Sequence, residues 1–158
     1  MQVDVVMVLP CAPSQLAPWV DDLSAYPEWM GLVHRAAPQP GDGPAWAVDL
    51  RARVGPLARS KRLRMVRTTP PGPGTVQFER RELDGRTHGR WEFTVVYDAV
   101  AGRAEHTDLS VVLRYDGALW TAGVLERILQ DEIERSKERL YALVSEGRSP
   151  LASGGPTR

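Results

Sequence analysis

The strongest constraint on the fold is a series of short segments between residues 46 and 115 in which apolar and polar side chains alternate. In the first of these segments Trp46, Val48 and Leu50 share one face, and Asp49 lies on the other. Turn sequences rich in glycine and proline separate the segments at intervals of about ten residues. Such intervals suit hairpins and are too short for the crossover helices that parallel strands require. The pattern therefore predicts an antiparallel sheet with one apolar and one polar face.

The N-terminal stretch shows the same alternation, ends at Pro10 and is followed by a short helical pattern. Ser14 is a candidate N-cap for this helix, in which Trp19 and Leu23 lie on one side. Pro27 interrupts the helical pattern. The strands predicted in this way are residues 2–9, 46–54, 62–68, 75–83, 90–98 and 106–115.

Residues 118–146 have the periodicity of one long amphipathic helix. Its apolar stripe consists of Leu125, Ile128, Leu129, Ile133, Ser136, Leu140, Leu143 and Val144. A helix of this length can cover the apolar face of the sheet. We therefore expect an α+β fold, in which a curved antiparallel sheet wraps around the C-terminal helix and leaves space between them. Residues 1–147 form one domain in this interpretation, and the tail 148–158 is predicted to be disordered.

The composition excludes several classes of protein. Twenty basic residues balance twenty acidic ones, so we expect no binding to nucleic acid. The single Cys11 excludes an internal disulfide, and the three scattered histidines argue against a metal site. No apolar run is long enough to span a membrane, and Asp4 interrupts an N-terminus that lacks the basic region of a signal peptide. We expect a cytoplasmic protein without a cofactor, either a monomer or a homodimer, and the excess of arginine over lysine is typical of a GC-rich bacterial genome.

The stretch between the first strand and the meander carries a recognisable motif. Pro10 follows the strand, Asp22 follows the short helix, and Tyr26, Pro27 and Trp29 complete a Tyr-Pro-x-Trp pattern. Together with the order of strands and helices, this motif resembles the START-like (SRPBCC) helix-grip superfamily. Within that superfamily the sequence is similar to bacterial polyketide cyclase/dehydrase-like proteins.

This resemblance covers about residues 1–146 and implies a deep, mostly apolar cavity between the sheet and the C-terminal helix. Members of the superfamily include lipid carriers, hormone receptors, aromatase/cyclases and quinone-binding proteins, so the fold alone does not identify an activity. We expect binding of a small hydrophobic ligand such as a lipid, a polyketide or a quinone. One alternative is a polyketide aromatase/cyclase or dehydratase that acts in the same cavity without a metal or nucleotide cofactor.

The predicted ligand contacts come from the motif and from the inward faces of the strands and the helix. Tyr26, Trp29 and Met30 either line the mouth of the cavity or cap the core. The wall residues either contact a ligand or form an ordinary core, and they are Trp46, Leu50, Leu63, Met65, Phe78, Trp91, Phe93, Val95, Leu109, Val111, Leu125 and Leu129.

Three polar residues are candidates for catalysis. Arg67 shares a face with Leu63 and Met65 and in the cavity would orient a ketone or enolate oxygen; a splayed strand end would instead leave Arg67 in solvent, and we favour that alternative. The hydroxyl of Tyr97 needs a partner if it is buried. Glu132 lies at the border of the apolar stripe, where it either faces the cavity as an acid or base or reaches water.

Several basic residues on two predicted strands suggest a further alternative. Arg51, Arg53, Arg62 and Arg64, with Lys61, are predicted to form a solvated basic strip on the outside of the sheet. Such a strip fits a regulatory or toxin–antitoxin-type protein that binds an acidic partner, unless neighbouring carboxylates neutralise it.

Overall fold

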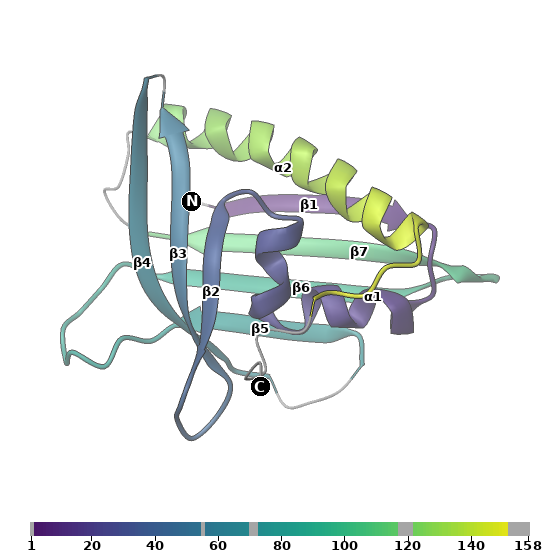
Figure 1. The fold of residues 1–158 in the computed structure, drawn as a ribbon, viewed down its shortest axis with the longest axis horizontal. Coiled ribbons are helices and arrows are strands. Elements are labelled where there is room, and N and C mark those ends of the chain that lie inside the picture. The colour runs from purple at the N-terminus through teal and green to yellow at the C-terminus, as the bar shows by residue number, and fades with distance from the viewer. Residues whose placement is uncertain (1, 55, 70–72, 117–121, 152–158) are drawn as a thin grey trace.

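One antiparallel sheet runs through most of the chain, which a computed structural model describes for residues 2–54, 56–69, 73–116 and 122–151. Seven strands of these residues join the sheet in the order β1-β7-β6-β5-β4-β3-β2 (Figure 1). They are β1 (Gln2–Leu9), β2 (Val33–Gln39), β3 (Ala45–Val54), β4 (Leu57–Arg67), β5 (Thr75–Arg80), β6 (Trp91–Val100) and β7 (Arg103–Tyr115). The described helical elements are α1 (Pro13–Val20), the 3-10 helix η1 (Leu23–Glu28) and the C-terminal helix α2 (Ala122–Ser145).

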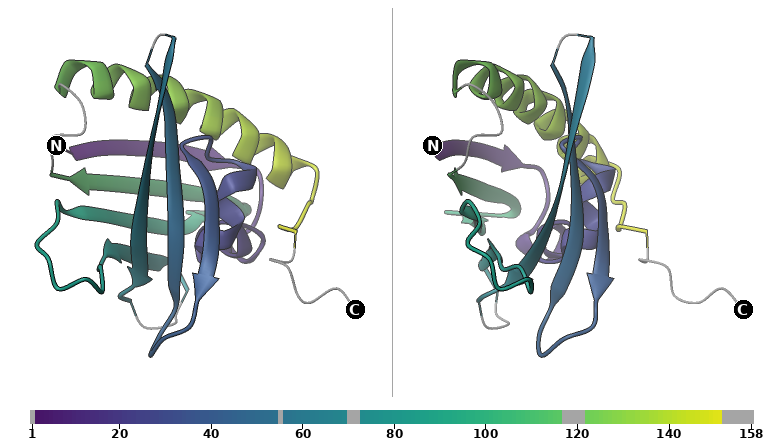
Figure 2. Two further views of the ribbon diagram at one scale, coloured as in Figure 1. Left: turned by 60° about the vertical axis from the view of Figure 1, so that its left-hand side comes forward. Right: turned by 90° about the vertical axis from the view of Figure 1, so that its left-hand side faces the viewer.

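The sheet bends sharply between β4 and β5, so β2, β3 and β4 run across the direction of the other four strands (Figures 1 and 2). Among the described residues, β4 and β5 pair at only three positions, from Met65 to Arg67 on β4. Helix α2 crosses the concave side of the bent sheet, and α1 and η1 lie beside it on that side (Figure 2). The predicted α+β fold, a curved sheet around a C-terminal helix, is confirmed.

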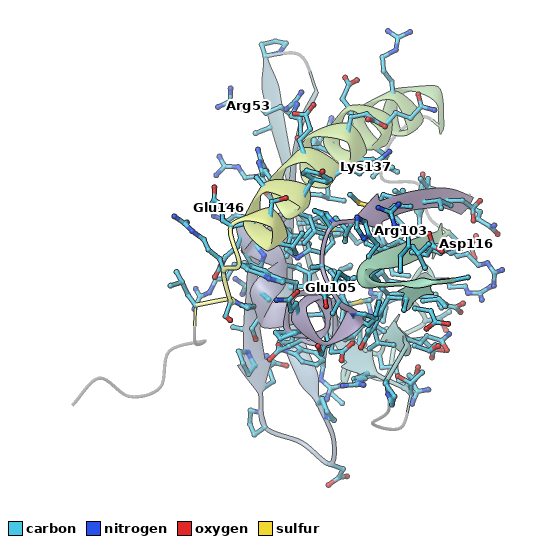
Figure 3. All side chains as sticks on the ribbon, turned by 90° about the vertical axis from the view of Figure 1, so that its right-hand side faces the viewer. Arg53, Arg103, Glu105, Asp116, Lys137 and Glu146 are labelled. Carbon is cyan, nitrogen blue, oxygen red and sulfur yellow. The ribbon has the colours of Figure 1, made fainter. Side chains whose placement is uncertain are left out.

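The predicted alternation along the strands is also confirmed by burial. Apolar side chains at every second position turn toward the helices, because burying them there removes their surface from water. The buried inward-facing residues are Trp46, Val48, Leu50, Ala52, Leu63, Met65, Val76, Phe78, Trp91, Phe93, Val95, Tyr97, Leu109 and Val111. Charged residues such as Arg53, Arg103 and Glu146 extend from the outside of the molecule (Figure 3).

Strand β2 was not predicted from the sequence. Its residues carry little apolar signal, since only Val33 is fully buried and the strand contains Pro38. Proline donates no backbone hydrogen bond, but an edge strand tolerates it because one side of the strand has no neighbour. β2 pairs with β3 alone, so its position depends on that ladder and not on its own pattern.

The prediction of the helix after the first strand was wrong about where the helix begins and where it ends. Ser14 is not its N-cap: α1 begins at Pro13, Ala12 is the N-cap, and the Ala12 N–H donates to Gln15 Oε1 at 3.1 Å. Proline suits the first helical position because its fixed φ matches the helix and no N–H is needed there. The helix ends at Val20, and Pro27 lies inside η1 instead of ending α1.

The chain after α2 packs back onto α1 and η1. Trp19 Nε1 donates to the backbone oxygen of Arg148 at 3.1 Å, and the Leu151 N–H donates to Glu28 Oε1 at 2.9 Å. Residues 118–121 of the predicted helix and residues 152–158 of the predicted tail lie outside the described residues. The division into a domain and a disordered tail stays a prediction.

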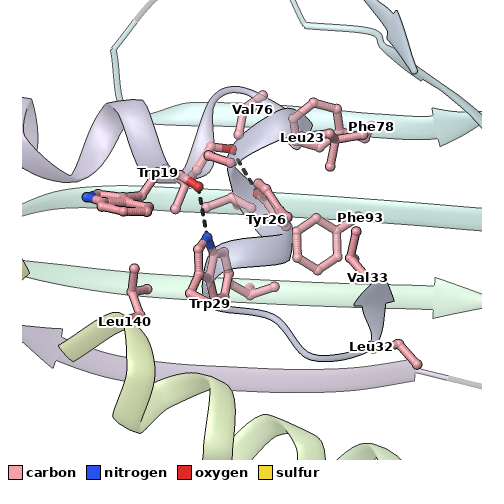
Figure 4. Packing of buried hydrophobic residues seen from close by; sticks show 14 of the residues in the cluster. Trp19, Leu23, Tyr26, Trp29, Leu32, Val33, Val76, Phe78, Phe93 and Leu140 are labelled. Atoms are coloured by element: carbon pink, nitrogen blue, oxygen red, sulfur yellow. Dashed lines mark hydrogen bonds between the residues drawn. The ribbon is translucent and has the colours of Figure 1, made fainter. Parts of the chain in front are cut away.

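The motif around Tyr26 forms the centre of the core and not an exposed loop (Figure 4). The buried Tyr26 hydroxyl donates to the backbone oxygen of Val20 at 2.8 Å, and Trp29 Nε1 donates to the backbone oxygen of Trp19 at 3.0 Å. The Tyr26 ring also contacts Phe93, with centroids 5.6 Å apart. These two side chains therefore satisfy backbone oxygens near the end of α1 while they fill the concave side of the sheet.

We predict that Y26F destabilises the protein by about 1–3 kcal/mol, because it leaves the buried oxygen of Val20 without its donor. Urea unfolding followed by circular dichroism measures this difference. The matched control is Y141F on the exposed side of α2, which we expect to change stability by less than about 0.5 kcal/mol. Equal stability of the two variants would contradict the assigned role of the Tyr26 hydroxyl.

Candidate ligand cavity

An apolar cavity of about 70 Å³ lies between α2 and the sheet, and we call it the α2 compartment. By this measure one water molecule needs roughly 10–15 Å³, so the space exceeds that of a single water. The lining is almost entirely carbon and comes from β1, β6, β7, α2 and the segment after η1. The lining residues are Val3, Val5, Met7, Trp29, Met30, Leu32, Phe93, Leu109, Val111, Leu113, Leu129, Glu132, Ile133, Ser136, Lys137 and Leu140.

A second apolar cavity of about 60 Å³, the η1 compartment, lies beside the first, toward β3 and β4. Its lining residues are Leu23, Tyr26, Met30, Leu32, Val33, Val48, Leu50, Leu63, Met65, Trp91, Phe93 and Leu113. Met30, Leu32, Phe93 and Leu113 line both compartments and so form the partition between them. Methionine is unbranched and adapts its shape easily, so a movement of Met30 is the simplest way to join the two spaces.

Polar side chains reach the α2 compartment from one face of α2. Arg135 Nη1 donates to Glu132 Oε1 at 3.1 Å, whereas Glu132 Oε2 is buried and has no hydrogen-bond partner among the described residues. The Ser136 hydroxyl, one turn further along, is likewise buried and without a partner in the described part of the chain. Trp91 lines the η1 compartment, and its indole nitrogen is also buried without a hydrogen-bond partner among the described residues. Buried polar atoms almost always have partners, so we expect a water molecule or a polar ligand group at these atoms.

The predicted contact residues divide among three locations. Those in the α2 compartment are Trp29, Met30, Phe93, Leu109, Val111 and Leu129. Those in the η1 compartment are Tyr26, Met30, Leu50, Leu63, Met65, Trp91 and Phe93. Trp46, Phe78 and Val95 are buried in the surrounding core, where the rings of Trp46 and Phe78 meet edge-on at 5.6 Å, and their contact with a ligand stays a prediction. The side chain of Leu125 lies outside the described residues.

Other lining residues were not selected from the sequence. Val3, Val5 and Met7 belong to a correctly predicted strand, but only the tertiary structure shows that β1 lies under α2. Ser136 belongs to the predicted apolar stripe of the helix. A serine inside an apolar stripe is itself a signal, because the helix turns that position toward the core.

Of the three candidate catalytic residues, only Glu132 lines a compartment. Tyr97 instead donates its hydroxyl to both carboxylate oxygens of Asp21, at 3.0 and 2.9 Å. Arg67 was expected in solvent, but it is half-buried, its charge acts on Asp21 and Tyr97, and its Nε is buried without a partner among the described residues. Arg67 therefore belongs to a polar cluster with Asp21 and Tyr97 at the end of α1, separate from the apolar cavity.

Burial governs the protonation of this polar cluster. It raises the pKa of the Asp21 carboxyl above its ordinary value, although the hydrogen bond from Tyr97 and the charge of Arg67 oppose the shift. Burial, followed by the hydrogen bond to Asp21 and the charge of that carboxylate, raises the pKa of Tyr97 to about 12. Tyr97 is therefore a neutral hydrogen-bond donor at physiological pH.

The basic strip on the outside of β3 and β4 is partly neutralised. Arg62 Nε lies 2.7 Å from Asp49 Oδ1 on the neighbouring strand, and Arg64 Nη1 donates to the backbone oxygen of Arg81 at 3.0 Å. Arg53 extends from the far end of β3, beyond these contacts (Figure 3). Lys61 is half-buried.

Within the described residues, no group of three or more His, Cys, Asp or Glu side chains is placed to hold a metal ion. His88 instead lies 2.8 Å from an oxygen of Asp84. None of the described helices combines the length and the apolarity needed to cross a bilayer.

The sequence matches one family of known proteins over most of its length. Residues 1–145 match a family described as "Polyketide cyclase / dehydrase and lipid transport". No curated protein matches the sequence.

Solved structures show the same fold at low sequence identity. A START superfamily protein from Mycobacterium smegmatis is 16% identical, with a TM-score of 0.69 over 92% of this chain and 97% of the other. The Zhui aromatase/cyclase from Streptomyces sp. R1128 is 12% identical, with a TM-score of 0.69 over 98% of each chain. A conserved protein from Geobacillus kaustophilus is 11% identical, with a TM-score of 0.71 over 92% of this chain and 96% of the other.

The raised pKa of Asp21 predicts a pH-dependent stability difference. The folded state holds the Asp21 proton more tightly than the unfolded state, so this stabilising contribution is present below the unfolded-state pKa and is lost as the pH rises through the folded-state pKa. D21N removes the titrating group and keeps an acceptor for Tyr97. We expect the difference in unfolding free energy, wild type minus D21N, to become more positive as the pH falls from 7 to about 4.

Urea unfolding at a series of pH values measures this difference. The matched control is D22N, which alters the exposed neighbouring carboxylate. An equal pH-dependent difference between the wild type and D22N, or a difference between the wild type and D21N that does not change with pH, would contradict the assignment.

Proposed function

The chain belongs to the polyketide cyclase/dehydrase and lipid transport family, and from this we propose that it binds a small hydrophobic molecule in the cavity between its sheet and α2. The observation that carries the proposal is the unfilled apolar space inside the core, in two adjoining compartments with carbon-lined walls. The ligand classes that suit such walls are lipids, polyketides and quinone-like molecules. The fold similarity to a START superfamily protein supports the same proposal.

Physical chemistry favours a ligand in this space. Protein interiors are packed about as densely as organic crystals, and side chains around a void lose the dispersion contacts they would otherwise make. A hydrophobic ligand restores these contacts and removes its own apolar surface from water, at roughly 25 cal/mol per Å². The cavity therefore favours a hydrophobic ligand, because the side chains around it lack packing contacts in the protein without ligand.

A ligand larger than one compartment requires the partition to move. Met30 lies two residues after η1 and is only partly buried, whereas Phe93 belongs to β6, which has a neighbouring strand on each side. A rotation of Met30 costs less than a shift of a strand, because its side chain has three flexible torsions and little of the sheet depends on it. We infer that ligand length is accommodated at Met30.

A second candidate function is cyclisation or dehydration of a polyketide in the same cavity. The specific observation in its favour is the carboxylate oxygen Oε2 of Glu132, which borders the α2 compartment without a partner. An unpartnered carboxylate beside a bound ketone is placed to accept a proton from the adjacent carbon. The Zhui aromatase/cyclase shares the fold, which shows only that the fold can hold such an enzyme.

We predict that V111F fills the α2 compartment and weakens binding of propylbenzene at least tenfold, because Val111 lines the space that the probe must occupy. Isothermal titration calorimetry measures the affinity, and the fluorescence of Trp29, another lining residue, provides an independent signal.

The matched control is V112F, since Val112 is the next residue on β7 and its side chain faces the other side of the sheet. We expect this variant to bind propylbenzene within about twofold of the wild type. Unchanged binding by V111F, in a protein that unfolds as cooperatively as the wild type, would place the ligand elsewhere.

A further inference from the structure

Two residues that line the otherwise carbon-lined α2 compartment carry buried polar atoms without partners among the described residues. Glu132 Oε2 and the Ser136 hydroxyl are both buried, both lack partners among the described residues, and both side chains line the α2 compartment. Their residues are four apart on α2, which places them one above the other on the same face of the helix. At that spacing the two side chains are neighbours on the helix surface, so a single ligand group bound beside them would be close to both.

The two atoms differ in the hydrogen bonds that they can form. An ionised carboxylate oxygen only accepts hydrogen bonds, whereas a serine hydroxyl both donates and accepts. A hydroxyl on the ligand matches this pair, because it donates its proton to Glu132 Oε2 and accepts the proton of Ser136 Oγ. A hydrocarbon leaves both atoms without partners, and buried polar atoms without partners oppose binding.

Surrounding contacts hold the carboxylate in place. Arg135 donates to the other oxygen, Oε1, at 3.1 Å, so one side of the carboxylate is already occupied. Gly31, directly after Met30, lies so close that a Cβ atom at this position would come within 2.5 Å of Glu132 Oε2 and 2.9 Å of Arg139 Nη1. Glu132 Oε2 thus lies against the segment after η1, and it is the carboxylate oxygen that has no hydrogen-bond partner among the described residues.

Lys137, the cation in the lining of the compartment, does not reverse this preference. Lys137 lines the compartment, but its ammonium group lies 3.6 Å from the exposed carboxylate of Glu134 (Figure 3 shows Lys137 on α2). Lysine side chains commonly bury their carbon stem in this way and keep the charge in water. A ligand carboxylate beside Glu132 Oε2 would instead bring two negative charges together in an apolar site.

We propose that the cavity selects hydrophobic ligands that carry a hydroxyl or phenol group and rejects carboxylates of the same carbon frame, through Glu132 and Ser136 of α2. This inference rests on the proposed binding function and specifies its ligand class. Glu132 and Ser136 act in it as specificity residues that contact the ligand head group.

The test compares three probes on the full chain: 4-propylphenol, propylbenzene and 4-propylbenzoate, each titrated by calorimetry at pH 7. We expect the wild type to bind the phenol at least tenfold more tightly than propylbenzene, and the benzoate at least tenfold more weakly than the phenol. S136A should reduce the preference for the phenol over propylbenzene severalfold, because one of the two hydrogen bonds is lost. E132Q should reduce the discrimination against the benzoate, because the negative charge is removed.

The matched control is E138Q, which makes the same chemical change on the exposed side of α2 and should preserve all three affinities. G31A provides a variant that leaves both polar residues intact. Gly31 does not have a positive φ, so its backbone accepts alanine, but the new Cβ displaces the Glu132 carboxylate and should weaken the preference for the phenol.

The outcomes separate the two proposals. Equal affinity of the wild type for propylbenzene and the phenol, or tighter binding of the benzoate, would overturn the selectivity and leave the binding function intact. Absence of binding by all three probes would overturn the binding function itself. Wild-type selectivity that persists in both S136A and E132Q would assign the head group to another part of the cavity and overturn the roles of these residues.

Discussion

The concave face of the bent sheet presents more apolar surface than α2 alone covers, and the rest of the structure depends on how the remainder is buried. The segment from α1 to Trp29 covers it with large side chains, of which Trp19, Tyr26 and Trp29 are almost completely buried. Their hydrogen bonds to the backbone oxygens of Val20 and Trp19 allow a chain that is no longer α-helical to enter the core without leaving those polar groups unpaired. The cavity exists because α2 and this segment approach the sheet from two directions and leave space where they meet.

Polar chemistry inside the molecule is divided between two places. At the end of α1, Asp21, Tyr97 and Arg67 form a cluster in which the Tyr97 hydroxyl has its partner in Asp21. Beneath α2, Glu132 and Ser136 border an apolar space with atoms that have no partner among the described residues. A satisfied hydrogen bond stabilises the fold, whereas an unsatisfied atom beside a void is available to a ligand. The Tyr97–Asp21 hydrogen bond is therefore interpreted as structural, although Arg67 Nε in the same cluster is also without a partner among the described residues. Glu132 and Ser136 differ from that cluster in that they line the α2 compartment, and they are interpreted as the polar part of the proposed binding site.

Much of the fold could be predicted from the sequence because its signals are local. The alternation of Trp46, Val48 and Leu50 indicates a half-buried strand whatever its neighbours are, and the stripe from Leu129 to Val144 indicates a helix with one buried face. Strand β2 could not be found in this way, since its stability comes from pairing with β3. The site was predictable only in part: parity correctly turned Tyr97 inward, but its hydrogen bond to Asp21 joins residues that are far apart in the sequence.

The sequence by itself determined the strands, the long helix, the inward faces and the resemblance to a cavity-forming family, because each depends on periodicity or on a contiguous motif. Only the tertiary structure decided which inward residues surround empty space and which fill the core. Val111 lines the cavity, whereas Val95 is buried in the core. The strand patterns do not predict this difference, since both residues are inward-facing valines on neighbouring strands. It arises from where α2 and the Trp29 segment lie above them, and a void is a property of several packed elements together and not of any one of them.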